Sequence, residues 1–103
     1  MVYLAYFASG LLITNGFPHF VNGISGRNFQ SPFASPPGIG ESSPLINVIW
    51  GMVNFVLGYL LLAGVGNFTI GITVDALFFG LGSVLMSMIL SWHFGRVRTA
   101  KDL

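Results

Sequence analysis

The chain has 103 residues, of which 53% are hydrophobic and 7% are charged. An ordinary soluble domain is roughly a quarter charged, so this composition excludes a conventional water-soluble surface and favours an integral membrane protein embedded in a lipid bilayer. The net charge of +1 predicts no nucleic-acid partner, and the lack of cysteine excludes disulfides and thiolate metal sites.

Three long stretches with few charges predict three helices, at residues 2–24, 44–64 and 74–94. A helix needs about 20 apolar residues to cross a bilayer, and each stretch is long enough. The first is expected to be a span and not a signal peptide, because no basic residue precedes it and no A-x-A cleavage site follows. We therefore predict an all-α fold, a three-helix transmembrane bundle forming a single domain over residues 1–103.

Pro18 lies inside the first predicted helix. Proline removes a backbone hydrogen bond and clashes with the carbonyl four residues back, here that of Thr14, so the sequence predicts a kink near Pro18 or an early end. In transporters such broken helices expose backbone groups to substrate, whereas most bends are satisfied by neighbouring helices. Both alternatives remain open.

The ends of the other two helices carry capping signals. Ser43 followed by Pro44 suits a helix start, Thr73 can cap the third helix, and Asp75 falls in its first turn. The intervening residues 25–43 are rich in proline, glycine and serine, which predicts an irregular loop without a helix. Its apolar residues suggest that it folds back onto the protein or lies among lipid headgroups; they are Phe29, Phe33 and Ile39.

Basic residues predict the orientation, because loops rich in Lys and Arg stay in the cytoplasm. With three crossings, the first loop and the C-terminus share one side, and that side holds Arg27, Arg96, Arg98 and Lys101. We expect the N-terminus outside and the C-terminus inside, as in a multi-pass protein of the bacterial inner membrane.

Small and weakly polar residues form stripes at helical spacing, and such stripes commonly let membrane helices pack closely. On the second helix the stripe is Asn47, Gly51, Asn54 and Gly58. On the third helix it includes Gly80, Ser83, Ser87 and Ser91. The alternative is a polar path through the membrane, for which the candidate lining residues are Asn15, Pro18, Trp50 and Asn54.

The two histidines, His19 and His93, are both expected near the cytoplasmic end and are candidates for a metal, haem or proton-relay site. Hydrogen bonding to backbone or headgroups is the simpler interpretation, and no cofactor is predicted. Familiar catalytic motifs are missing from the sequence, so no catalytic residue is assigned and an enzyme is disfavoured.

These features resemble those of two families. A proline inside helix one, with Trp50 and Asn54 on the second helix, resembles the bacterial half-SWEET sugar transporters, whose three-helix protomers dimerise; that family has Pro-Gln where this chain has Pro18 and His19. The stretch from Gly16 to Gly51, GFPHFVNGISGRNFQSPFASPPGIGESSPLINVIWG, resembles small bacterial membrane proteins of the DoxX-like kind, which typically have four helices.

The leading expectation is a small membrane protein that acts through helix–helix assembly, as a homo-oligomer or as an accessory subunit of a membrane complex. One alternative is a dimeric transporter for a small polar solute. The other is a metal- or haem-binding membrane subunit that uses His19 and His93.

Overall fold

The structure, a computed structural model, describes residues 1–102 and contains three helices and one short strand pair. Helix α1 is Val2–Ile24, α2 is Pro44–Ala63 and α3 is Val74–Asp102. Strands β1, Phe29–Gln30, and β2, Glu41–Ser42, pair antiparallel within the first loop. The all-α prediction with three helices is confirmed.

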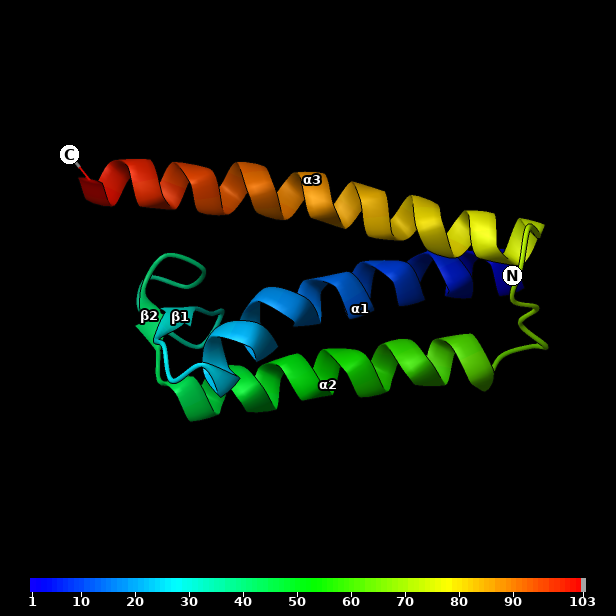
Figure 1. Ribbon diagram of the computed structural model, residues 1–103, viewed down its shortest axis with the longest axis horizontal. Coiled ribbons are helices and arrows are strands. Elements are labelled where there is room, and N and C mark those ends of the chain that lie inside the picture. Colours follow the sequence, from blue (N-terminus) through cyan, green and yellow to red (C-terminus); the bar gives the residue numbers. More distant parts are fainter. Residues whose placement is uncertain (103) are drawn as a thin grey trace.

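Helix α1 lies between α2 and α3, so the three helices form one layer with α1 in the middle (Figure 1). The loop over residues 25–43 lies at the same end as the C-terminal end of α3, and the N-terminus lies at the other end with the α2–α3 connection. Within residues 1–102, the extensive helix packing is that of α1 on each neighbour. Helix α1 therefore holds the layer together.

Helices α2 and α3 are long and apolar enough to cross a membrane, whereas α1 is long enough but less apolar. Of the three membrane spans expected from the sequence, two helices thus have the length and apolar composition of a span. Helix α1 carries polar residues that its neighbours enclose, among them Ser9 and His19, and an enclosed helix needs less apolar outer surface.

Helix bounds agree with the predicted ones at α1 and almost so at α2, but α3 continues eight residues beyond the predicted end at Phe94. Its last turns contain Ala, Lys and Arg, which are strong helix formers, and nothing there stops the helix. The alternative of an early end for α1 is wrong, because the helix continues through Pro18. The kink stays a prediction.

Both predicted N-caps are present. The Ile46 amide donates to Ser43 Oγ at 3.3 Å, and the Ala76 amide donates to Thr73 Oγ1 at 3.1 Å. Asp75 adds a further link, because its carboxylate accepts from the Thr69 amide at 3.0 Å. These contacts fix the start of α2 and α3 relative to the connections before them.

Close packing of α1 on α2 depends on two matching rows of small residues. Ser9, Gly16 and Gly23 face α2 at intervals of seven residues, which is about two helical turns. A Cβ on Gly16 would lie 2.9 Å from the Gly51 carbonyl oxygen, and one on Gly51 would lie 3.0 Å from that of Gly16. The two backbones thus approach to a distance that a larger side chain at either position prevents.

Helix α3 reaches α1 in the same way, through Gly10 of α1 and Gly82 of α3. A Cβ on Gly10 would collide with the backbone of Phe79, and a Cβ on Gly82 would collide with that of Phe7. One turn further along, Thr14 Oγ1 donates to Ser83 Oγ at 2.8 Å. A hydroxyl pair and two glycines therefore define the α1–α3 contact.

Candidate functional site

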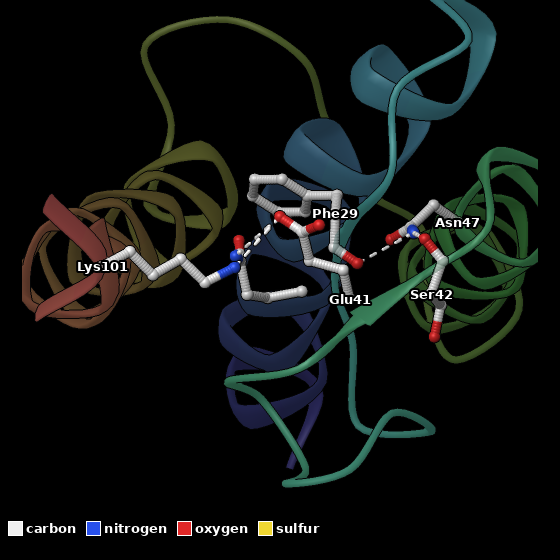
Figure 2. Close-up of polar contacts among 6 residues, drawn as sticks. Phe29, Glu41, Ser42, Asn47 and Lys101 are labelled. Atoms are coloured by element: carbon white, nitrogen blue, oxygen red, sulfur yellow. Dashed lines mark hydrogen bonds and ion pairs between the residues drawn. The ribbon is translucent and has the colours of Figure 1, made fainter.

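The first loop folds back over one end of the helix layer, and Asn47 on α2 anchors it. The Asn47 amide nitrogen donates to three backbone carbonyls at 3.1 to 3.2 Å, those of Phe29, Ser42 and Ser43. Figure 2 shows the side chain of Asn47 directed at the strand pair. The prediction that the loop folds back onto the protein is confirmed, and the strand pair that Asn47 holds was not foreseen.

The same asparagine fixes the orientation of His19 on α1. Because the Asn47 nitrogen faces three carbonyls, its oxygen must be the atom that faces His19 Nδ1, at 2.9 Å. An amide oxygen only accepts, so Nδ1 carries the proton and donates. In the neutral ring the other nitrogen, Nε2, then keeps a free lone pair, and no residue in the described part of the chain hydrogen-bonds to it.

Next to His19 is a pocket of about 330 Å³ formed by all three helices and the loop. Its lining consists of Asn15, His19, Gln30, Ser31, Pro32, Pro37, Gly38, Trp50, Leu90, His93 and Phe94. None of these residues carries a formal charge at pH 7 when histidine is neutral. The pocket is therefore uncharged and largely apolar, with a few polar groups in its wall, and it is suited to an uncharged molecule.

Two side chains of this lining hold a buried polar atom without a hydrogen-bond partner among residues 1–102, Gln30 Oε1 and Trp50 Nε1. Gln30 is 3% exposed, and its amide nitrogen makes a long contact of 3.4 Å with Glu41. An unpaired buried donor or acceptor costs about 1–3 kcal/mol. A molecule in the pocket that hydrogen-bonds to either atom, after a small rotation of that side chain, would remove this cost.

The candidate path residues divide into two groups. Asn15 and Trp50 line the pocket, whereas Asn54 and Pro18 do not. Asn54 lies behind Asn15: it accepts from the Asn15 amide at 3.1 Å and donates to the Trp50 carbonyl at 2.8 Å. Pro18 is half-buried on α1, and its carbonyl accepts from Asn22 at 2.7 Å.

The predicted packing residues fall into those that lie between helices and those that do not. Asn47, Gly51 and Gly58 are buried on the face of α2 that meets α1, while Ser83 contacts Thr14. On α3 the remaining residues of the stripe lie outside this packing: a Cβ on Gly80 would meet nothing within 4 Å, and Ser87 and Ser91 are exposed.

Several residues that build the site were not identified from the sequence. Ser9 Oγ donates to the Gly58 carbonyl at 2.6 Å, and Gly10, Gly16, Gly23 and Gly82 allow the close helix approach. The seven-residue spacing of Ser9, Gly16 and Gly23 was a usable signal. Gln30 and Ser31 had none, because their burial depends on where the loop folds.

Both histidines line the same pocket, and the ring of Phe94 lies against each, at centroid distances of 6.3 Å from His19 and 5.2 Å from His93. His93 Nε2 donates to the Gly38 carbonyl at 2.7 Å, which ties α3 to the loop. Among the described residues there is no group of three His, Cys, Asp or Glu side chains placed to hold a metal. The metal or haem prediction therefore has two imidazoles and no third ligand of those types.

No family model, curated protein or solved structure matches this chain. The half-SWEET and DoxX-like resemblances thus gain no support from these comparisons. The pocket and the surface of the chain are therefore the observations that bear on its function.

Proposed function

We propose that the chain is an integral protein of the bacterial inner membrane, with all three helices crossing the bilayer. Large apolar side chains are exposed along α2 and α3, and only 6% of the apolar window of α3 is buried. Water does not tolerate such a surface, whereas lipid covers it at no cost. With α1 packed between two spanning neighbours, its polar groups are shielded from lipid.

The proposed orientation has the N-terminus outside and the first loop and C-terminal end of α3 in the cytoplasm. The two ends of the layer differ in charge, because Arg27, Arg96, Arg98 and Lys101 all belong to the loop end. This asymmetry is the pattern of the positive-inside rule.

Single cysteines test this orientation, since the natural sequence has none. Asn28→Cys lies in the first loop and Asn67→Cys in the second, and both positions are exposed. A membrane-impermeant maleimide added to intact cells is expected to label Asn67→Cys at once and Asn28→Cys only after permeabilisation. The reverse pattern contradicts the orientation, and equal labelling of both positions in intact cells contradicts the crossing itself.

We propose further that the pocket beside His19 binds a small uncharged polar solute on its way across the membrane. The observation that carries this proposal is the free lone pair of His19 Nε2, held in place by Asn47, in a pocket that no charged residue lines. A hydroxyl or amide group of the solute donates to Nε2, and the unpaired atoms of Gln30 and Trp50 supply an acceptor and a donor. The pocket volume of about 330 Å³ is near the lower limit for ligand-binding pockets, which is about 300–1,000 Å³, so the pocket suits a small molecule.

A permeability measurement tests the transport role. Proteoliposomes are mixed rapidly with glycerol, urea or glucose, and their swelling is followed by light scattering. At least one solute is expected to enter faster than it enters protein-free liposomes, and Asn54→Leu is expected to return that rate to the background. Asn54 holds the side chain of Asn15, so its loss frees this lining residue, whereas its other hydrogen bond, to the Trp50 backbone carbonyl, lies within α2.

Asn22→Leu is the matched control for this experiment, because the side chain of Asn22 hydrogen-bonds only within its own helix and lies outside the pocket. The control is expected to keep the wild-type rate. If all three solutes enter at the background rate in wild-type proteoliposomes, the transport proposal is wrong. If Asn54→Leu lowers the rate and also changes the oligomer mass in detergent, Asn54 acts through helix packing and not through the pocket.

A second proposed role, assembly with another copy or with a partner of a membrane complex, has its own support. Gly80, Ser87 and Ser91 form a small-residue stripe on α3 that its packing on α1 leaves unused. Such stripes commonly mediate helix contacts in lipid. The detergent mass measurement of the preceding experiment tests it, since a monomeric mass contradicts homo-oligomerisation.

A further inference from the structure

A second pocket, of about 380 Å³, lies between the first loop and the last turns of α3. Its lining is Ile39, His93, Arg96, Val97, Ala100 and Lys101. Apolar side chains and two cations thus share one concave surface. This combination differs from the uncharged lining of the pocket beside His19, although His93 borders both.

Arg96 is positioned without a carboxylate partner among residues 1–101. Its guanidinium lies 4.7 Å from the centre of the Trp92 ring, a cation–π contact that holds the side chain against α3. Arginine in this state keeps its fork of N–H donors free for an anion, and phosphate oxygens match that fork.

Lys101 has a partner that another anion can replace. Its Nζ lies 3.1 Å from Glu41 Oε2, with the two side chains 46% and 42% exposed. Figure 2 shows Lys101 reaching from α3 across to Glu41 on β2. A solvent-exposed ion pair contributes little to stability, so the lysine can exchange the carboxylate for a phosphate at small cost.

The surface of α3 next to this pocket is apolar and exposed. Met88, Ile89 and Trp92 precede Arg96 by one to two turns and are 66%, 46% and 63% exposed. Tryptophan beside arginine at the end of a spanning helix marks the headgroup level of a bilayer. An acyl chain can therefore lie along α3 while its headgroup reaches the cations.

We propose that this pocket binds the headgroup of an anionic phospholipid of the cytoplasmic leaflet. The phosphate lies between Arg96 and Lys101, and the glycerol and upper acyl carbons contact Ile39, Val97 and Ala100. This inference rests on the proposed membrane location and orientation, but it is independent of the solute pocket. Lipid bound there bridges the loop and α3, which are otherwise joined at this end by the hydrogen bonds of His93 and Lys101 and by the ring contact of Phe29 with Phe94.

Lipid titration of the detergent-solubilised protein tests the proposal. Native mass spectrometry measures retention of phosphatidylglycerol and, separately, of phosphatidylcholine, whose headgroup is neutral overall. Phosphatidylglycerol is expected to be retained about tenfold more strongly, because both cations attract its phosphate. Arg96→Gln removes one of the two cations and is expected to reduce this preference to about threefold.

Arg98→Gln is the matched control, because it removes the same charge two residues away and Arg98 does not line the pocket. It is expected to change retention less than twofold. Glu41→Gln gives an effect of opposite sign: it releases Lys101 from its ion pair, so phosphatidylglycerol retention is expected to rise. A variant that simply unfolds cannot produce that gain.

Equal losses in Arg96→Gln and Arg98→Gln overturn the proposal in favour of diffuse charge attraction, as does equal retention of the two lipids by the wild type. Displacement of phosphatidylglycerol by millimolar inorganic phosphate also overturns it, because the site then binds a free anion. Failure of the membrane proposal is recognised separately by the cysteine labelling described above.

Discussion

Replacing Gly82 with leucine is expected to separate α3 from α1. The added side chain would begin at a Cβ that already collides with the Phe7 carbonyl and lies 3.1 Å from the Leu11 amide nitrogen, and neither backbone atom can move away alone. Overpacking costs about 1–3 kcal/mol in a well-packed interior, and this contact is the main attachment of α3. The helix is therefore expected to detach while α1 and α2 stay together.

Disulfide cross-linking measures this separation directly. Thr14 and Ser83 touch through their hydroxyls at 2.8 Å, so the pair Thr14→Cys and Ser83→Cys is expected to oxidise readily. In the Gly82→Leu background the yield should fall about tenfold, the factor that corresponds to 1.4 kcal/mol.

Gly80→Leu is the matched control, since a Cβ at that position would meet nothing within 4 Å. The same glycine-to-leucine change in the same helix is expected to leave the cross-link intact. A high yield in both backgrounds would contradict the glycine contact between α1 and α3.

Asn47→Leu is expected to release the first loop from the helix layer and to abolish the pocket beside His19. Leucine has a similar volume but no polar atoms, so three backbone carbonyls and His19 Nδ1 lose their hydrogen bonds to this side chain. The Ser43 carbonyl keeps the backbone amide of residue 47 as a donor, whereas the contacts to Phe29, Ser42 and His19 are lost. At about 1 kcal/mol for each hydrogen bond, the loss amounts to about 3–4 kcal/mol. Hydrogen exchange of the amides of residues 29–42 is expected to accelerate, with a lower midpoint for unfolding in detergent.

Asn47→Asp separates the two roles of this side chain. Aspartate keeps an oxygen for His19 but cannot donate, so it is expected to free the loop almost as completely as leucine does. Asn22→Leu, which removes one hydrogen bond within α1, should cost at most about 1 kcal/mol. Unchanged protection of residues 29–42 in both Asn47 variants would show that Asn47 does not anchor the loop.

The helices, their starts and the buried stripe of α2 could be predicted because each depends on residues close in sequence. Ser43 caps the helix that begins at the next residue, and the stripe from Asn47 to Gly58 follows the period of a single helix. The extension of α3 was not predicted, because a cluster of basic residues commonly marks the end of a membrane span and is equally compatible with a helix that continues beyond the membrane.

The site could not be predicted to the same extent, since its contacts join distant residues. His19 and Asn47 are 28 positions apart, and nothing in the sequence pairs one histidine with one particular asparagine. Gln30 and Ser31 look like ordinary loop residues, and they are buried because the loop folds back against the helices. Trp50 and Asn15 were selected for their chemistry, but their meeting at one pocket required the three-dimensional arrangement.

The central position of α1 determines which helix pair can form first as the chain is synthesised. The rows of small residues that join α1 and α2 both precede α3 in the chain, so a chain stopped after Ala63 is expected to form two helices with a full mutual interface. Deleting α1 instead would leave α2 and α3 without the surface on which each packs. The chain order and the packing of α1 therefore predict a folding intermediate in which α1 and α2 are paired before α3 packs on α1.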